Sequence, residues 1–348
     1  MTTNEIKQAP KSVEEVETRP VVAILIIFAA VLSVVVAAFV SIGYGAADID
    51  FSTIWEAIFH FDPALTTHQI IIELRIPRVI GGVLIGSFLA VSGAIMQGMT
   101  RNPLADSSII GISDGAGLAI AILMALFTGV GYVGLMFGSF VGAGLCTALI
   151  FLIGSLAKGG LSPAKLALAG ITIGAFVGAV SSGIAIYFNV AQDISFWFAG
   201  GFTSMNWFQI YLIVPVALVG LIMAFVLARS VTVLSLGIDV ARGLGQRTKL
   251  IRFFGIITVM LLTGAAVAVS GTIGFIGLVI PHITRPLVGR DYRLIIPCSA
   301  ALGALLLVLA DIAARMVNAP YEVPVGAMTA IIGVPFFLYL ARREGRGL

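Results

Sequence analysis

Long apolar segments separated by short polar ones run through almost the whole sequence. A helix that crosses a bilayer needs about 20 predominantly apolar residues, and ten segments approach that length. They cover residues 21–43, 76–97, 108–128, 132–154, 164–188, 207–228, 252–270, 273–288, 294–314 and 324–341. The eighth is short and rich in glycine, which indicates a broken or partial span. The pattern predicts an all-α polytopic membrane protein with about ten transmembrane helices.

The composition supports the same fold class. Hydrophobic residues make up 59% of the 348 positions and charged residues 11%, whereas soluble domains carry about 25% charged residues. The formal net charge of +3 is therefore better explained by basic loops that set membrane topology than by binding to nucleic acid. Cys146 and Cys298 lie inside apolar segments, show no metal or disulfide spacing, and are expected to be small buried hydrophobic residues.

The N-terminal 20 residues are polar, and we expect them to form a cytoplasmic tail ahead of one transmembrane domain at 21–348. The first apolar segment is longer than the apolar stretch of about 7–15 residues in a secretory signal. It is therefore expected to be a retained first span.

Lysine and arginine favour cytoplasmic loops, and their positions predict that both termini are cytoplasmic. With that orientation, all but three of the 20 basic residues are cytoplasmic. The cytoplasmic set is Lys7, Lys11, Arg19, Arg101, Lys158, Lys165, Arg229, Arg242, Arg247, Lys249, Arg252, Arg285, Arg290, Arg293, Arg342, Arg343 and Arg346. The exceptions are Arg75 and Arg78, in the stretch "ELRIPR", and Arg315.

The arginines of "ELRIPR" have two alternative explanations. Arg75 and Arg78 are three residues apart, so on a helix they share one face, and Pro77 suits a first helical turn. They could anchor the helix at the membrane interface, with long side chains reaching the head groups. Alternatively they could dock an acidic partner, because the guanidinium group binds carboxylates through two hydrogen bonds.

Two loop segments are predicted to be helical. The outer stretch "FSTIWEAIFHF" at 51–61 is amphipathic and predicts a short helix lying on the surface. On the cytoplasmic side, "LSLGIDVARGLG" at 234–245 predicts a short helix bracketed by glycines. This second segment is either an ordinary amphipathic loop helix or a contact for a soluble subunit.

Catalytic chemistry is not visible in the sequence. The middle of each apolar segment lacks ionisable residues, while Asp114 and Asp311 lie near segment ends. An ion-coupled transporter usually keeps an ionisable group in the membrane, although sodium coupling through backbone carbonyls stays open. The chain also has no G-x-x-x-x-G-K-[ST] loop for phosphates. Any ATP chemistry must come from a partner.

Glycines recur at four-residue spacing in several segments, a pattern that lets helices approach closely. The ridges are Gly82/Gly86, Gly134/Gly138/Gly142 and Gly170/Gly174/Gly178, and they serve packing within the chain, a subunit interface or a pore lining. The tetrapeptide "AVSG" occurs at 90–93 and 268–271. Because the two copies would cross the membrane in opposite directions, they make an inverted repeat a candidate feature.

Several longer motifs resemble one family. "ELRIPRVIGGVLIGSFLAVSGAIMQGMTRNPLAD", "GIDVARGLG", "GTIGFIGLVIPHITR", "LADIAAR" and "EVPVGAMTAIIGVPFFLYL" occur in that order and are similar to the permease subunits of iron–siderophore and cobalamin ABC importers, the FecCD-type family. The resemblance covers the chain from about residue 21 to residue 342. It implies ten-span subunits that pair around a central path in the cell (inner) membrane.

The resemblance also implies roles for particular residues. The arginines that face acidic residues of a substrate-binding protein would be Arg75, Arg78 and Arg315. The helix that sits in a cleft of the ATPase would lie within 234–245 and use Leu236, Gly237, Asp239, Ala241, Arg242 and Gly245. His282 and Arg285 would add cytoplasmic contacts, and a gate would lie at about 164–200.

These implications define the predicted function. The chain would be a permease without catalytic activity or a metal site of its own, importing a ferric siderophore, with cobalamin and haem as the other cargoes. Its partners would be a second permease, identical or related, two ATPase subunits that bind ATP and magnesium, a substrate-binding protein outside the cell membrane, and the lipid bilayer. An ion-coupled secondary transporter and a membrane-embedded receptor are the rival functions.

Overall fold

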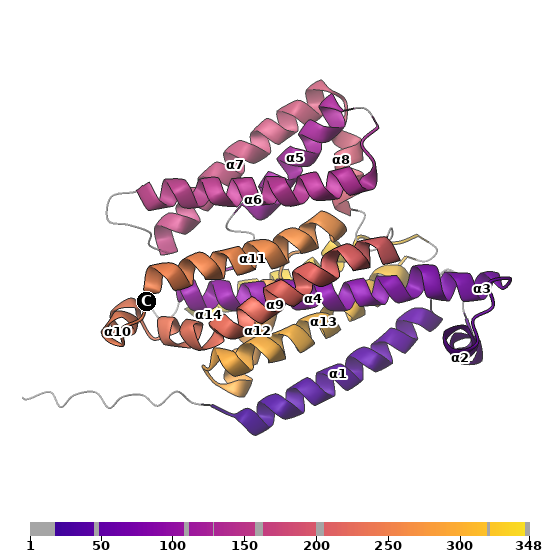
Figure 1. The fold of residues 1–348 in the computed structure, drawn as a ribbon, viewed down its shortest axis with the longest axis horizontal. Helices are drawn as coiled ribbons and strands as arrows, with labels where there is room; N and C mark the ends of the chain where they lie inside the picture. Colours follow the sequence, from indigo (N-terminus) through magenta and orange to yellow (C-terminus); the bar gives the residue numbers. More distant parts are fainter. Residues whose placement is uncertain are drawn as a thin grey trace, which may run out of the picture.

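A computed structural model describes residues 18–44, 49–107, 111–127, 129–156, 163–199, 205–318 and 321–344. Within them the chain is helical and has no strand, apart from one isolated β-bridge between Thr18 and Gly289 (Figure 1). This confirms the predicted all-α class. Most of the predicted N-terminal tail lies outside the described residues, as do Lys158 and Arg346.

The helices follow one another with short connections. In chain order they are α1 Pro20–Gly43, α2 Phe51–Phe59, α3 Thr66–Gln69, the π-helical segment η1 Ile70–Arg75, α4 Ile76–Thr100, α5 Ile112–Leu126, α6 Tyr132–Leu156, α7 Pro163–Tyr187, α8 Ala191–Ala199, α9 Trp207–Ser235, α10 Ile238–Gly243, α11 Thr248–Ser270, α12 Ile276–Val288, α13 Tyr292–Met316 and α14 Val325–Glu344.

Seven helices of the described chain are long and apolar enough to cross a membrane, and three shorter apolar helices lie at 112–126, 276–288 and 325–340. Each of the ten predicted segments therefore contains an apolar helix. The number of crossings and the orientation remain predictions. We name the two ends of the bundle by their short helices: α10 lies at the α10 end, and α2 and α3 lie at the α2 end (Figure 1).

The outermost helix, α1, shows how membrane helices are packed. Its buried positions include Ala23, Ala30 and Ala37, seven residues apart, while most of its large apolar side chains are exposed. Lipid tails are as apolar as leucine, so burying a large side chain brings little gain and small residues that allow close packing form the interface. The large side chains are left to face lipid.

Helix α4 is the centre of the bundle and packs on α9, α11, α12 and α13. It belongs to the continuous helical run Thr66–Thr100, the most buried of the seven long helices. Its glycines meet backbone: a Cβ on Gly86 would clash with the carbonyl oxygen of Gly303, and one on Gly93 would clash with that of Gly277. These contacts allow the helices to approach backbone to backbone.

Helices α5, α6, α7 and α8 form a second group, which contacts the rest of the molecule through α11 (Figure 1). The predicted glycine ridges lie inside this group and in α4. Gly142 of α6 meets Gly115 of α5, and Gly174 of α7 meets the carboxylate of Asp114. For these glycines the prediction of packing within the chain is confirmed.

The helix containing "ELRIPR" begins earlier than the sequence indicates. The predicted apolar segment begins at residue 76, with Pro77 in its first turn, but α3 and η1 continue directly into α4. Pro77 has no N–H to donate and its ring crowds the carbonyl four residues earlier. A π-helical turn immediately before it accommodates that mismatch within a continuous helix.

The eighth segment, predicted to be a broken or partial span, contains only the short helix α12, preceded by non-helical residues. Residues 271–275, which are not helical, link α11 to α12, with Gly271 at φ 69° and Phe275 at φ 70°. The Phe275 ring packs against Gly333 of α14. The "AVSG" copies occupy different positions, one inside α4 and the other at the end of α11, so they do not mark equivalent sites, and the inverted repeat stays a prediction.

Replacing Gly93 with alanine should destabilise the protein strongly, because the added methyl group would meet the backbone of Gly277 rather than a side chain that could move. Overpacking of this kind costs about 1–3 kcal/mol or more. We expect a lower thermal midpoint in detergent. Gly183→Ala is the matched control, since nothing lies within 4 Å of its added methyl group. Equal midpoints for the two variants would contradict this packing.

Candidate functional site

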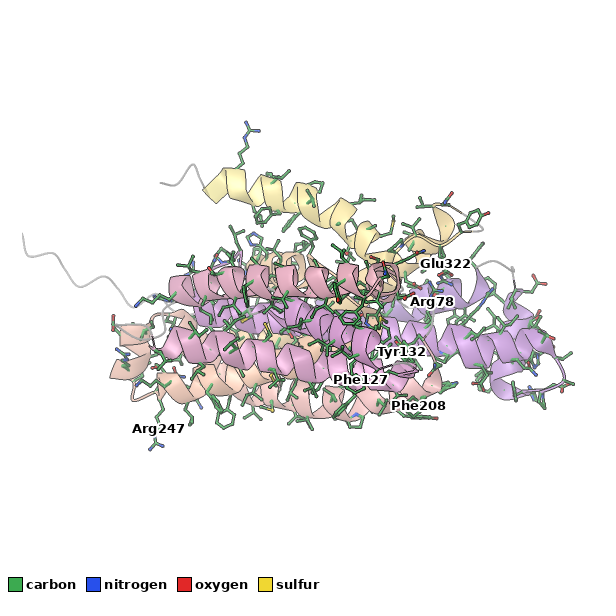
Figure 2. All side chains as sticks on the ribbon, turned by 90° about the horizontal axis from the view of Figure 1, so that it is seen from above. Arg78, Phe127, Tyr132, Phe208, Arg247 and Glu322 are labelled. Atoms are coloured by element: carbon green, nitrogen blue, oxygen red, sulfur yellow. The ribbon has the colours of Figure 1, made fainter. Side chains whose placement is uncertain are left out.

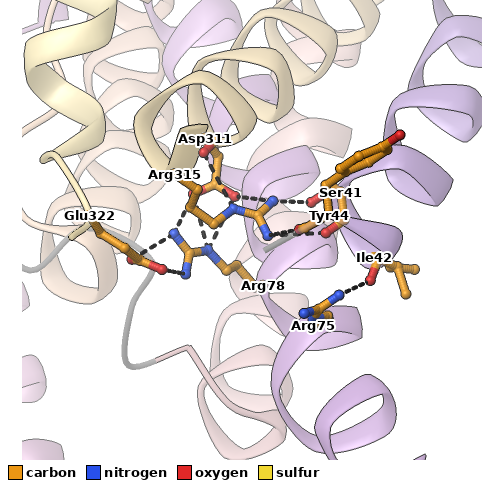
Figure 3. Close-up of polar contacts among 8 residues, drawn as sticks. All are labelled: Ser41, Ile42, Tyr44, Arg75, Arg78, Asp311, Arg315 and Glu322. Atoms are coloured by element: carbon orange, nitrogen blue, oxygen red, sulfur yellow. Dashed lines mark hydrogen bonds and ion pairs between the residues drawn. The ribbon is translucent and has the colours of Figure 1, made fainter. Parts of the chain in front are cut away.

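Four charged side chains meet toward the α2 end of the bundle, where α1, α4 and α13 come together (Figure 3). They are Arg78 from α4, Asp311 and Arg315 from α13, and Glu322 from the segment between α13 and α14. Two positive and two negative charges make this charged cluster formally neutral. Arg75 lies near the cluster with partners of its own.

Arg75 serves the end of a helix. Its guanidinium donates to the carbonyl oxygens of Ile42 and Gly43, at the end of α1, and only 8% of the residue is exposed. The last carbonyls of a helix have no partner within the helix, so a buried cation that donates to them stabilises the end. Arg75 and Arg78 therefore act on different neighbours rather than as one face.

Arg78 binds two carboxylates at once. Its Nε lies 3.1 Å from both oxygens of Asp311, and its Nη2 lies 2.9 Å from Oδ1. Its Nη1 and Nη2 donate to the two oxygens of Glu322 at 2.9 and 3.0 Å. Asp311 thus binds along the side of the guanidinium and Glu322 binds across its tip.

Arg315 joins the cluster to α1. Its Nη2 lies 3.1 Å from Asp311, one helical turn earlier. Its Nη1 donates to the carbonyl oxygens of Ser41 and Tyr44 at 3.0 and 3.2 Å. Asp311, which is 3% exposed, is therefore shared by two arginines and holds α4, α13 and the end of α1 together.

The sequence singled out the three arginines but assigned no role to their carboxylates. The four-residue spacing of Asp311 and Arg315 was a usable signal, because residues at that spacing face each other on a helix. Glu322 carried no such signal, since it lies 244 residues from Arg78. Docking of a partner at these arginines remains a prediction.

At the opposite end, α10 and the residues directly flanking it expose three apolar side chains, which we call the apolar stripe. Leu236, Val240 and Leu244 are 44%, 48% and 68% exposed, and they are four residues apart. Asp239 and Arg242 are also exposed. Gly237 at φ 136° and Gly245 at φ 75° bracket the helix, as the sequence predicted. Figure 2 shows Arg247, between α10 and α11, at this end and Arg78 with Glu322 toward the other.

Ala241 differs from the other predicted residues of α10. Its side chain is fully buried, in a helix that packs on α9 and α11, so it holds α10 on the bundle instead of facing outward. The sequence analysis missed Val240 and Leu244.

His282 and Arg285 make contacts inside the chain. The His282 ring lies 5.7 Å from the ring of Phe336 in α14. Arg285 donates to the Gln97 side-chain oxygen at 2.8 Å and lies 3.4 Å from the Tyr292 hydroxyl. The Arg285 bonds join α12 to α4 and α13, and the His282 contact joins α12 to α14. Both residues lie on α12, apart from the helix α10.

Asp291 joins α9 to the start of α13 at the same end. It accepts hydrogen bonds from the Arg293 backbone N–H at 2.9 Å and from the Thr232 hydroxyl at 3.1 Å, and it pairs with the Arg293 guanidinium. Burial raises its pKa, but the bonds from Arg293 and Thr232 outweigh burial and lower the pKa of Asp291 below its ordinary value. The ionised form is therefore favoured.

The predicted gate at 164–200 corresponds mainly to α7 and α8, beside α5. The Phe198 ring lies over Gly117 of α5, and its backbone contacts Gly271 at the end of α11. The described residues include no group of three or more His, Cys, Asp or Glu side chains that could hold a metal ion.

Comparison with known proteins shows which family the sequence motifs belong to. Residues 25–343 match the model of the FecCD transport family. The iron(3+)-hydroxamate import system permease protein FhuB of Bacillus subtilis is 57% identical over 326 residues, covering 94% of this chain and 85% of that protein. The iron-uptake system permease protein FeuB of the same organism is 43% identical over 321 residues, covering 92% of this chain and 96% of that protein.

A solved structure gives the same fold. A metal-chelate type ABC transporter in an inward-facing conformation superposes with a TM-score of 0.80 at 29% identity, covering 92% of this chain and 99% of that chain. The family predicted from the motifs is thereby confirmed. The chain is a multi-pass protein of the cell membrane.

Replacing Asp311 with asparagine should destabilise the protein by about 3 kcal/mol, the size expected when one partner of a buried ion pair is removed. Asparagine keeps the shape but leaves two guanidinium groups facing each other. Thermal unfolding in detergent, followed by tryptophan fluorescence, would measure the loss. Asp193→Asn, at an exposed position of α8, is the control, and equal midpoints for the two variants would show that the cluster does not hold the helices together.

The Asp291 interactions should make part of the stability depend on pH. Because the folded-state pKa is lowered, this contribution is present above the unfolded pKa of about 3.9 and disappears as the pH falls through the folded pKa. The midpoint difference between wild type and Asp291→Asn should therefore be largest near neutral pH and shrink below about pH 4. A difference that does not change with pH would contradict a lowered pKa.

Proposed function

This chain belongs to the FecCD transport family, and from that membership we propose that it is the permease of an ATP-binding-cassette importer that carries a ferric hydroxamate siderophore. Its similarity to the hydroxamate import permease of B. subtilis supports this cargo. ATP would be bound and hydrolysed by two partner subunits, and a second permease, identical or related, would complete the path. A substrate-binding protein would deliver the chelate.

The exposed stripe of α10 is the observation that carries the proposal. Val240 lies in the six-residue helix α10, and Leu236 and Leu244 lie just before and just after it. Helix α10 is not one of the helices long enough to span the membrane. An apolar stripe flanked by charged residues fits the groove of a protein partner. We assign this groove to the ATPase subunit.

The connection of α10 to the spans provides the coupling. Helix α9 runs 29 residues and ends at Ser235, directly before Leu236. Ala241 seats α10 on the bundle, so movement of the bound ATPase would be passed to α9 by a packed element rather than a loose loop. Alternating closure of the ATPase subunits would then open the path to one side and the other.

The charged cluster at the opposite end is our candidate for docking the binding protein. This assignment requires the α2 end to lie outside the cell, as the distribution of basic residues predicts. The cluster already contains carboxylate–arginine pairs, the same interaction that an acidic partner surface would supply.

ATP-driven uptake tests the function directly. Proteoliposomes would contain the chain with its partner permease and ATPase, and the binding protein would be added outside. Entry of radiolabelled iron chelated by a hydroxamate siderophore is expected only with ATP inside, and excess haem or cobalamin should not compete. Uptake driven by an ion gradient would support a secondary transporter, and binding without uptake would support a receptor.

The substitution Leu244→Asp should abolish coupling to the ATPase, because it places a charge on the exposed stripe without touching the core. We expect loss of ATPase co-purification and at least a tenfold fall in uptake, about 1.4 kcal/mol. Val317→Asp is the control. Val317 is 66% exposed, close to the 68% of Leu244, but it lies past the end of α13 that is far from α10, so this variant should keep its ATPase co-purification. Normal uptake by Leu244→Asp would contradict the assigned groove.

A further inference from the structure

The three outer arginines are not equivalent as partners for an acidic protein. Arg75 is buried on the carbonyls at the end of α1, and Arg315 donates to two further carbonyls of that segment and to Asp311. Moving either side chain away would leave carbonyl groups at the end of α1 without a hydrogen-bond partner, and a buried polar group without a partner costs free energy. Neither side chain is suited to exchange its ligands for those of another protein.

Arg78 has one ligand suited to exchange. A guanidinium group can take one carboxylate along its Nε side and another across its tip. The side position is held by Asp311, which is buried and also bound to Arg315. The tip is held by Glu322, whose side chain is 36% exposed against 5% for Asp311.

From this geometry we infer that Glu322 occupies the position on Arg78 that a carboxylate of the docking protein would take, until the partner displaces it. The inference rests on the proposed function, which supplies a binding protein with an acidic surface. Glu322 would leave by rotation of its own side chain. Asp311 would stay and hold the guanidinium in its orientation.

The charge balance favours exchange over simple addition. The charged cluster is neutral with Glu322 in place, so a further carboxylate would make it negative and would also find the tip occupied. Replacement of one carboxylate by another keeps the cluster neutral. Glu322 is a competitor tethered to the same chain, and such a competitor acts at an effective concentration in the millimolar range. It therefore weakens docking, and a partner that offers only one weak contact would not displace it.

Removing the competitor should therefore strengthen docking. We would measure binding of the substrate-binding protein of the same transport system to the permease–ATPase complex in nanodiscs, by surface plasmon resonance. Glu322→Gln should bind on the order of tenfold tighter than wild type, because a neutral amide holds the tip of Arg78 more weakly than a carboxylate and the cluster carries one positive charge. High salt should reduce this gain.

The matched control separates exchange from a general change in charge. Glu73→Gln removes one negative charge from an exposed position of η1, five residues before Arg78, and should change the affinity less than twofold, about 0.4 kcal/mol. Thermal midpoints would confirm that both variants are folded. If Glu322→Gln binds no tighter than Glu73→Gln, the exchange is wrong while the importer assignment stands. If even the wild type binds no such protein and shows no ATP-driven uptake, the proposed function itself fails.

Discussion

The close approach of α4 to α12 and α13 is the contact on which the rest of this structure depends. Apolar side chains gain little by leaving lipid for protein, so helices in a membrane associate through tight packing and polar bonds. Gly86 against Gly303 and Gly93 against Gly277 bring backbone to backbone. Polar bonds then join the same helices on either side of these contacts: Arg78 binds Asp311 at one end, and Gln97 binds Arg285 at the other.

The two ends of the bundle carry different chemistry. The charged cluster near the α2 end is internally neutralised and mostly buried, whereas the stripe on α10 is apolar and exposed. A neutralised cluster can bind a partner by exchanging ligands, and an exposed apolar stripe binds one by being covered. Two soluble partners of different character, one at each end, are what an importer permease requires.

The same packing connects the ends. Only Leu236 and Gly237 connect α9 to α10, and Asp291 with Thr232 fastens α9 to the start of α13. Helix α13 carries Asp311 and Arg315 near its other end. In the proposed coupling, a displacement of α10 would therefore act on helices that also carry the charged cluster, through rigid elements already in contact.

The sequence by itself determined the membrane class, the positions of the apolar helices, the glycine-bracketed helix α10 and the exceptional arginines at the α2 end. These follow from apolar length, the distribution of basic residues and backbone freedom, which are properties of single segments. The family motifs led to the family before the fold was known.

Only the tertiary structure decided what the arginines do. Asp311 lies 233 residues from Arg78 and Glu322 lies 244 residues away, so their pairing depends on how α4 and α13 pack and on the path of the chain after α13. Helix packing likewise buries Ala241 and places Arg75 where it donates to the carbonyls at the end of α1. A side chain's partner across the bundle is set by the packing of whole helices, which the local pattern around that residue does not contain.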